Sequence, residues 1–96
     1  MSRHILLEIK TEPEGAIVYL IPKIIWDRNP NILDTNYTKL LEKFRCYEGY
    51  TPLSLIVEEY VYVIVLKNDK NGKYKTAICK PKYKNRIEKV FLKMNE

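Results

Sequence analysis

The sequence predicts a mainly β protein: a small antiparallel β-sandwich of about six strands with one short helix at about residues 35–47. Apolar and polar residues alternate with the period of two that half-buried strands show, and turn-forming residues separate the short runs. The chain has 96 residues, of which 46% are hydrophobic and 30% charged, which is typical of one globular domain. We therefore expect a single domain over residues 1–96, with an insertion at about residues 22–49.

The first two strands are expected at residues 5–10 and 16–21. The first alternates apolar and polar residues, whereas the second is continuously apolar, which suits a strand covered on both faces. Between them, Pro13 fixes a backbone angle and Gly15 accepts backbone conformations that other residues avoid, so the chain should reverse there. Pro22 has no N–H donor and should end the second strand.

The insertion differs in character from the strands around it. A polar loop is expected around Trp26, followed by the helix. The helix prediction rests on apolar residues at the i, i+3, i+4, i+7 spacing of one helical face, with a polar cap before them and a glycine after them. The face is Tyr37, Leu40, Leu41, Phe44 and Tyr47, the cap is Thr35 or Asn36, and the terminator is Gly49.

The remaining strands are expected at residues 53–57, at 60–67 with a hairpin partner after it, and at 85–94. Asn71-Gly72 suits a two-residue type I′ turn, because both turn positions need a positive φ. That turn would pair Lys67 with Thr76, and it places apolar side chains on both faces of the hairpin. We expect the facing sheet to cover one of these faces and the helix of the insertion to cover the other.

Two short motifs resemble a known family. Residues 13–16 read Pro-Glu-Gly-Ala and lead into a Val-Tyr strand, and residues 49–52 read Gly-Tyr-Thr-Pro and lead into alternating apolar residues and a second Tyr-containing strand at Tyr62. In this order, from about Ile5 to Leu92, the elements resemble the PEGA domain family. The chain departs from that pattern by roughly 20 extra residues before the second motif and by Tyr60, where a glycine is common.

The resemblance implies a sandwich of the transthyretin-like or carboxypeptidase-regulatory-like kind. Such domains serve as accessory, interaction or surface modules and share no catalytic site. The residues themselves also favour a protein that is not an enzyme and holds no metal or cofactor. His4 is the sole histidine, and the three glycines are dispersed rather than gathered in a phosphate-binding loop. Cys46 and Cys79 form no Cys-x-x-Cys pair, and they are either two free thiols or one disulfide.

Charge is distributed unevenly along the chain. Residues 67–93 contain ten basic residues against Asp69 and Glu88, a net charge of +8, whereas residues 1–66 contain seven basic and nine acidic residues. Four of the basic residues recur at every second position, so an extended backbone would direct them to one side: Lys80, Lys82, Lys84 and Arg86. This stripe predicts either an anion-binding surface for nucleic acid, lipid headgroups or acidic protein, or lysines that only keep an exposed strand soluble.

Trp26 and Arg28 are the other candidate contact residues, because aromatic side chains and arginine are typical interface anchors. The function that we expect is a non-catalytic protein-interaction or accessory module whose partner is another protein, and the alternative is a nucleic-acid-binding module that uses the basic stripe. The longest apolar run, residues 60–66, is too short to cross a membrane. Without a secretion signal the expected location is the cytoplasm, or outside it if the chain derives from a longer exported protein.

Overall fold

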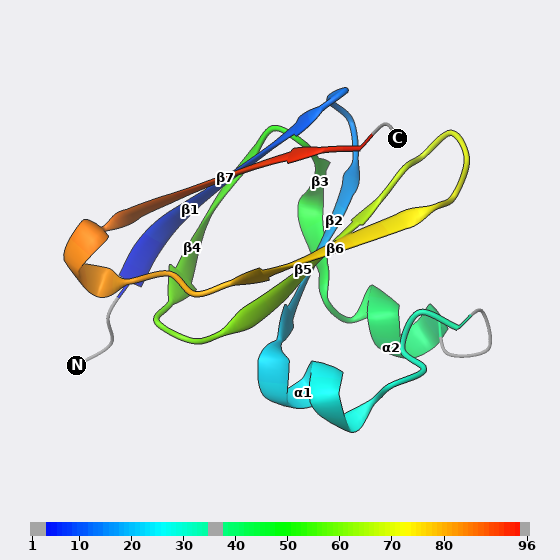
Figure 1. The fold of residues 1–96 in the computed structure, drawn as a ribbon, viewed down its shortest axis with the longest axis horizontal. Helices are drawn as coiled ribbons and strands as arrows, with labels where there is room; N and C mark the ends of the chain where they lie inside the picture. Colours follow the sequence, from blue (N-terminus) through cyan, green and yellow to red (C-terminus); the bar gives the residue numbers. More distant parts are fainter. Residues whose placement is uncertain (1–3, 35–37, 95–96) are drawn as a thin grey trace.

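The structure, a computed structural model, describes residues 4–34 and 38–94. Within these residues, seven strands form two facing sheets, with strand orders β4-β1-β7 and β3-β2-β5-β6 (Figure 1). The mainly β sandwich that the sequence predicts is therefore confirmed, with one strand and one helix more than expected. The strands are β1 (His4–Glu12), β2 (Ile17–Pro22), β3 (Arg45–Tyr50), β4 (Leu53–Glu58), β5 (Tyr62–Lys67), β6 (Tyr74–Cys79) and β7 (Ile87–Lys93), and the helices are α1 (Lys23–Arg28) and α2 (Thr38–Glu42).

The three-stranded sheet is built around β1. Its residues Ile5, Leu7 and Ile9 are fully buried and point at the second sheet, as their alternation predicts. β1 pairs antiparallel with β4 but parallel with β7, which departs from the all-antiparallel expectation. The chain crosses from one sheet to the other between β6 and β7, and β7 then lies beside β1 and runs in the same direction. Periodicity in a sequence does not encode this direction.

β2 is covered on both faces, as its continuous apolar run predicts. Val18 lies in the core between the two sheets, where β1 and the inner face of β5 also contribute. Tyr19 and Ile21 point the other way, into a second cluster with Val63 on the outer face of the four-stranded sheet. The chain between β2 and β3 covers that outer face (Figure 1). None of the helices in the described ranges is long and apolar enough to cross a membrane.

The insertion folds differently from its prediction. The helix expected at residues 35–47 is confined to α2, and the chain from Arg45 onward forms β3 against β2. Pairing with β2 prevails over helical spacing, because β2 offers an open edge and the Leu20 N–H donates to the Phe44 carbonyl at 3.0 Å. Gly49, expected to end the helix, lies within β3. Leu41 and Phe44 pack on the second cluster, whereas Thr35, Asn36, Tyr37 and the side chain of Tyr47 lie outside the described parts of the chain.

The β5–β6 hairpin has the predicted strands and faces but another register. Lys67 pairs with Tyr74 rather than Thr76, a shift of two residues that leaves every side chain on its expected face. The two-residue turn is replaced by a longer connection over residues 68–73. Its backbone is held by Asn68, whose side-chain oxygen accepts from the Lys70 N–H at 2.8 Å and whose carbonyl accepts from the Gly72 N–H at 2.8 Å.

The Pro-Glu-Gly-Ala turn and the Gly-Tyr-Thr-Pro element meet in space through Thr51. The buried hydroxyl of Thr51 accepts from the N–H groups of Gly15 at 3.1 Å and Ala16 at 3.0 Å, and it contacts the hydroxyl of Thr11. Thr11 in turn donates to the Pro13 carbonyl at 2.8 Å. Gly15 has a φ of +99°, a conformation that glycine adopts without strain. One threonine side chain therefore holds the turn between β1 and β2 against the start of β4.

Candidate interaction surface

An open apolar groove lies where α1 meets the connection between β4 and β5. Its volume is about 640 Å³. Ile24 and Tyr60 border it, and each has 59% of its surface exposed, so the groove offers apolar surface to solvent. We call this surface the α1 groove, and its residues are Pro22, Lys23, Ile24, Ile25, Asp27, Tyr60 and Val61.

The backbone fixes the two walls of the α1 groove relative to each other. The Lys23 N–H at the start of α1 donates to the Val61 carbonyl at 2.8 Å, and the Lys23 ammonium pairs with the Asp27 carboxylate one turn later at 2.8 Å. The ring of Tyr60 meets the ring of Tyr62 edge-on, with 6.3 Å between their centroids. The hydrogen bond of the Tyr60 hydroxyl to the Glu58 carboxylate raises the pKa of Tyr60.

The basic segment, residues 80–86, is not the extended strand that its alternation suggested. Tyr83–Asn85 forms a single 3₁₀ turn, and Arg86 has a left-handed φ of 60°. The prediction that the four basic side chains project to one side assumed a continuous extended backbone, and the structure does not have one there. All four are nevertheless exposed: Lys80, Lys82, Lys84 and Arg86.

The basic segment borders the same end of the molecule as the α1 groove. The Tyr83 N–H donates to the Glu59 carboxylate at 2.9 Å, and Glu59 directly precedes Tyr60 of the groove. The ring of Tyr83 is half-buried, with the Arg86 guanidinium 6.0 Å from its centroid. Residues 59–61 thus contact the insertion through Val61 and the basic segment through Glu59. In the sequence these two regions are far apart, and each is a separate candidate for partner binding.

The two contact candidates in the insertion have different environments. Trp26 is half-buried and packs on the second apolar cluster, so part of its ring supports the fold. Arg28 is exposed and lines a small pocket of about 190 Å³ with Asn29, outside the α1 groove. Neither residue lines the groove, whereas Ile24, Tyr60 and Val61 do. The sequence gives one hint of exposure for Tyr60 and Val61, because they directly follow two glutamates. The apolar pattern nevertheless assigns them to a strand.

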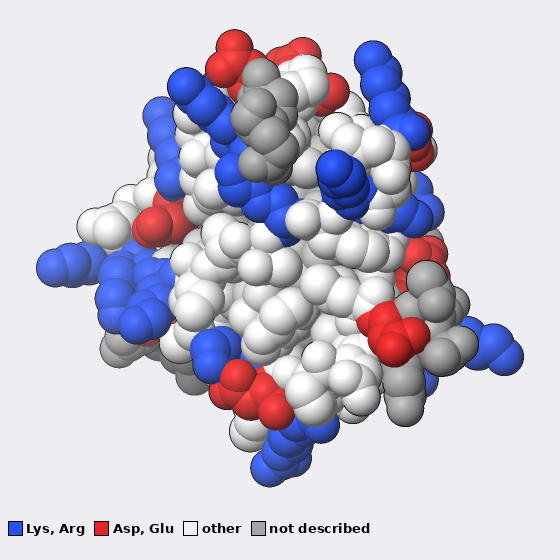
Figure 2. Space-filling model, turned by 45° about the vertical axis from the view of Figure 1, so that its right-hand side comes forward, with Lys and Arg blue, Asp and Glu red and all other residues white. Residues whose placement is uncertain are grey.

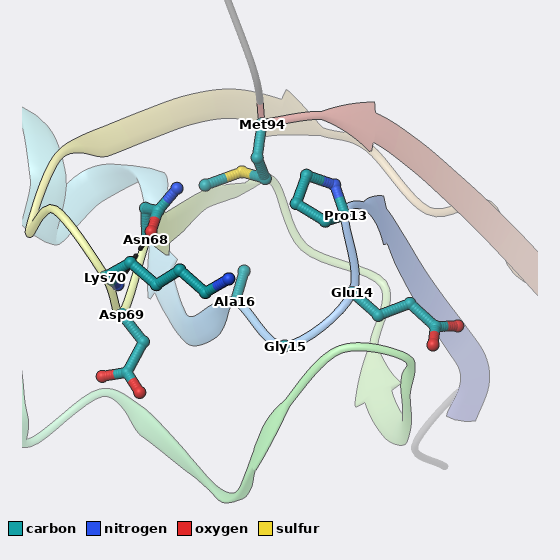
Figure 3. A pocket seen from close by; sticks show the side chains of 8 residues that line it. All are labelled: Pro13, Glu14, Gly15, Ala16, Asn68, Asp69, Lys70 and Met94. Atoms are coloured by element: carbon teal, nitrogen blue, oxygen red, sulfur yellow. Dashed lines mark hydrogen bonds between the residues drawn. The ribbon is translucent and has the colours of Figure 1, made fainter.

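A second pocket of about 220 Å³ lies at the opposite end of β2. Figure 3 shows the side chain of Lys70 extended toward Ala16, with Asn68 and Met94 above it, while Glu14 points away. The lining of the pocket therefore includes one amine, one carboxamide, the Asp69 carboxylate and apolar surface. Its residues are Pro13, Glu14, Gly15, Ala16, Asn68, Asp69, Lys70 and Met94.

The cysteines are two free thiols, which settles the alternative of a disulfide. Burial, and secondarily the charge of Glu88, raise the pKa of Cys79 to about 11, so its thiol is neutral and a poor nucleophile at physiological pH. Among the side chains that the structure describes, no three of the types His, Cys, Asp and Glu gather closely enough to hold a metal ion.

The charged side chains leave a broad area of the surface free. Figure 2 shows an uncharged area in the middle of one face, with both basic and acidic side chains around its margins. An apolar contact on such a surface would be flanked by charges of both signs. Comparison of the chain with protein-family models, curated proteins and solved structures found no match in any of the three.

Proposed function

We propose that the protein is a non-catalytic interaction module on a PEGA-like β-sandwich, and that another protein binds it in the α1 groove. The observation that carries this proposal is the groove itself, an open apolar surface at which Ile24 and Tyr60 are 59% exposed. Exposed apolar side chains that line one groove offer a partner a contiguous contact area, and interface centres are enriched in tyrosine. The assignment to the PEGA-like type rests on the two motifs, which Thr51 joins.

The basic segment gives the proposed partner its electrostatic character. The four exposed cations lie on the basic segment, which a hydrogen bond from the Tyr83 N–H ties to Glu59 beside the groove, so a partner segment with apolar anchors and acidic flanks fits this end of the molecule. Charges at the rim of an interface mainly steer association and set its salt dependence, while buried apolar anchors supply most of the affinity. Binding should therefore weaken as salt rises but persist in high salt.

The test is to recover bound proteins from the native lysate on wild-type protein and on two tyrosine variants. Tyr60→Ala removes a groove side chain, and Tyr50→Ala removes a tyrosine of β3 that is 48% exposed away from the groove. We expect one defined protein on wild type and on Tyr50→Ala, at least about tenfold less of it on Tyr60→Ala, and no effect of nuclease.

The same experiment can contradict the proposal. Equal recovery on Tyr60→Ala and Tyr50→Ala would exclude the groove as the binding surface. Recovery of nucleic acid that falls steeply with salt and is unaffected by Tyr60→Ala would instead assign the function to the basic segment, because phosphate contacts make binding strongly salt-dependent.

A further inference from the structure

The free edge of β4 is the least protected edge of the sandwich among those whose side chains the structure describes. β4 occupies one end of the strand order β4-β1-β7 and pairs only with β1 along its length, as far as the described residues show. Residues 53–57 read Leu-Ser-Leu-Ile-Val, without a charge, a proline or a glycine. A bare, β-prone edge of this kind is a template for pairing with another strand.

Two other edges carry the inward-pointing charges that block such pairing. On β6, Lys75 lies opposite the buried Leu66, and its ammonium donates across the gap to the Lys93 carbonyl of β7. On β7, Glu88 lies beside the buried Leu7 and so points between the sheets. Burying these charges against an incoming strand would be costly, and β4 has no counterpart to them between Leu53 and Val57.

The outer face next to the β4 edge is also apolar. Ile56, 62% exposed, is in register with the half-buried Leu6 of β1, and Leu6 is in register with Ile87 of β7. These three residues form an apolar row across all three strands. A further strand at the β4 edge would place its own outward side chain next to Ile56 and lengthen the row.

We propose that a second copy of this chain pairs with β4 through its own β4, in antiparallel orientation about a two-fold axis. β4 itself has the uncharged alternating pattern that the edge requires, and the antiparallel arrangement places the two Glu58 side chains at opposite ends of the contact. The joined sheet has the order β7-β1-β4-β4-β1-β7. Both of its outer edges are then β7, protected by Glu88, so the assembly closes at two copies rather than growing into a fibre.

Sedimentation over a range of concentrations tests this proposal with three charge substitutions. Ile56→Lys places a charge on the β4 edge, whereas Ile78→Lys alters an isoleucine of β6 that is 60% exposed and serves as the matched control. Phe91→Lys alters the same outer face, but on β7. We expect the wild-type mass to rise with concentration from 11.5 kDa toward twice that value, and Ile78→Lys and Phe91→Lys to behave in the same way.

Ile56→Lys should raise the dissociation constant at least about tenfold, because a charge on an edge strand opposes pairing. A wild-type mass of 11.5 kDa at every concentration would overturn the proposal, as would a dimer that Ile78→Lys or Phe91→Lys disrupts and Ile56→Lys does not. Amide hydrogen exchange of the wild-type protein gives a second reading. Its protection should increase with concentration in Leu53–Glu58, and an unchanged β4 would contradict the model. No residue that lines the α1 groove belongs to β4, so either result leaves the proposed function to its own test.

Discussion

The side chain of Thr51 accepts backbone hydrogen bonds that an apolar side chain at this position could not accept. Its hydroxyl accepts from two consecutive N–H groups, of Gly15 and Ala16, while its own N–H donates to the Ala16 carbonyl at 3.0 Å. Ala16 and Thr51 are both buried. A buried N–H group that loses its acceptor cannot bond to water instead, so it stays unpaired.

We therefore expect Thr51→Val to lower the free energy of unfolding by about 1 to 3 kcal/mol, the cost of leaving a buried N–H unpaired. Thr51→Ser keeps the hydroxyl and loses one methyl group, so its loss should stay below about 1 kcal/mol. Urea denaturation of the three proteins measures both values. If valine and serine cost the same, the hydroxyl is not what holds the turn.

The pKa of Tyr19 is raised because its side chain is buried under α2 and hydrogen-bonded to a carboxylate there. Burial, and then the hydrogen bond that its hydroxyl donates to the Glu42 carboxylate at 3.0 Å, raise the pKa of Tyr19 from 10.0 to about 12. Between these pH values the folded protein retains a proton that the unfolded chain releases. Since the unfolded state then binds fewer protons, stability falls as pH rises through this range.

The contribution of the Tyr19 hydroxyl should thus be complete below pH 10 and lost as the pH approaches about 12. Tyr19→Phe has no hydroxyl to titrate, and it serves as the reference against which the other tyrosines and lysines cancel. Denaturant midpoints for both proteins across this pH range should show the advantage of wild type shrinking. A constant difference would mean that Tyr19 does not contribute to the pH dependence.

At the scale of elements, the sequence predicts strands better than their partners. The alternation of Ile5, Leu7 and Ile9 identifies β1, because period-two burial is a property of the strand itself. The register of the β5–β6 hairpin differs by two residues, because Asn68 holds a longer turn through its side chain. β3 was missed for a related reason: Phe44 and its neighbours continue a helical spacing, and only the open edge of β2 makes them a strand.

The candidate site was predicted in part. The insertion and the basic segment were both singled out, and they do lie at one end of the molecule, joined by residues 59–61. The groove residues Ile24 and Tyr60 could not be found from the pattern, because exposure of an apolar side chain depends on what packs against it. Trp26 is the opposite case, because its polar neighbours in the sequence suggest exposure but its ring packs on the second cluster.

The packing of Trp26 on the second cluster leads to a prediction about stability. Trp26→Ala should lower the free energy of unfolding by about 1 to 3 kcal/mol, less than for a fully buried tryptophan because the ring is half-exposed. Arg28→Ala, two residues on and exposed, should change it by less than about 0.5 kcal/mol. Thermal denaturation compares the two, and equal losses would place Trp26 outside the cluster.

At the scale of the whole molecule, the two ends of the sandwich differ. One end holds the turn that Thr51 fixes, and the other holds α1, residues 59–61 and the basic segment. The second end combines the α1 groove with the basic segment, whereas the turn at the first end is held by hydrogen bonds to Thr51. The groove at the second end is the physical basis for placing the proposed function there.

Photo-crosslinking tests that placement most directly. A photoreactive phenylalanine analogue takes the place of Tyr60 in one protein and of Tyr50 in another, and both are irradiated in native lysate. The proposal predicts a covalent adduct with one defined protein from position 60 and none from position 50. Adducts of equal yield at both positions, or adducts with nucleic acid alone, would contradict a protein-binding groove between α1 and the β4–β5 connection.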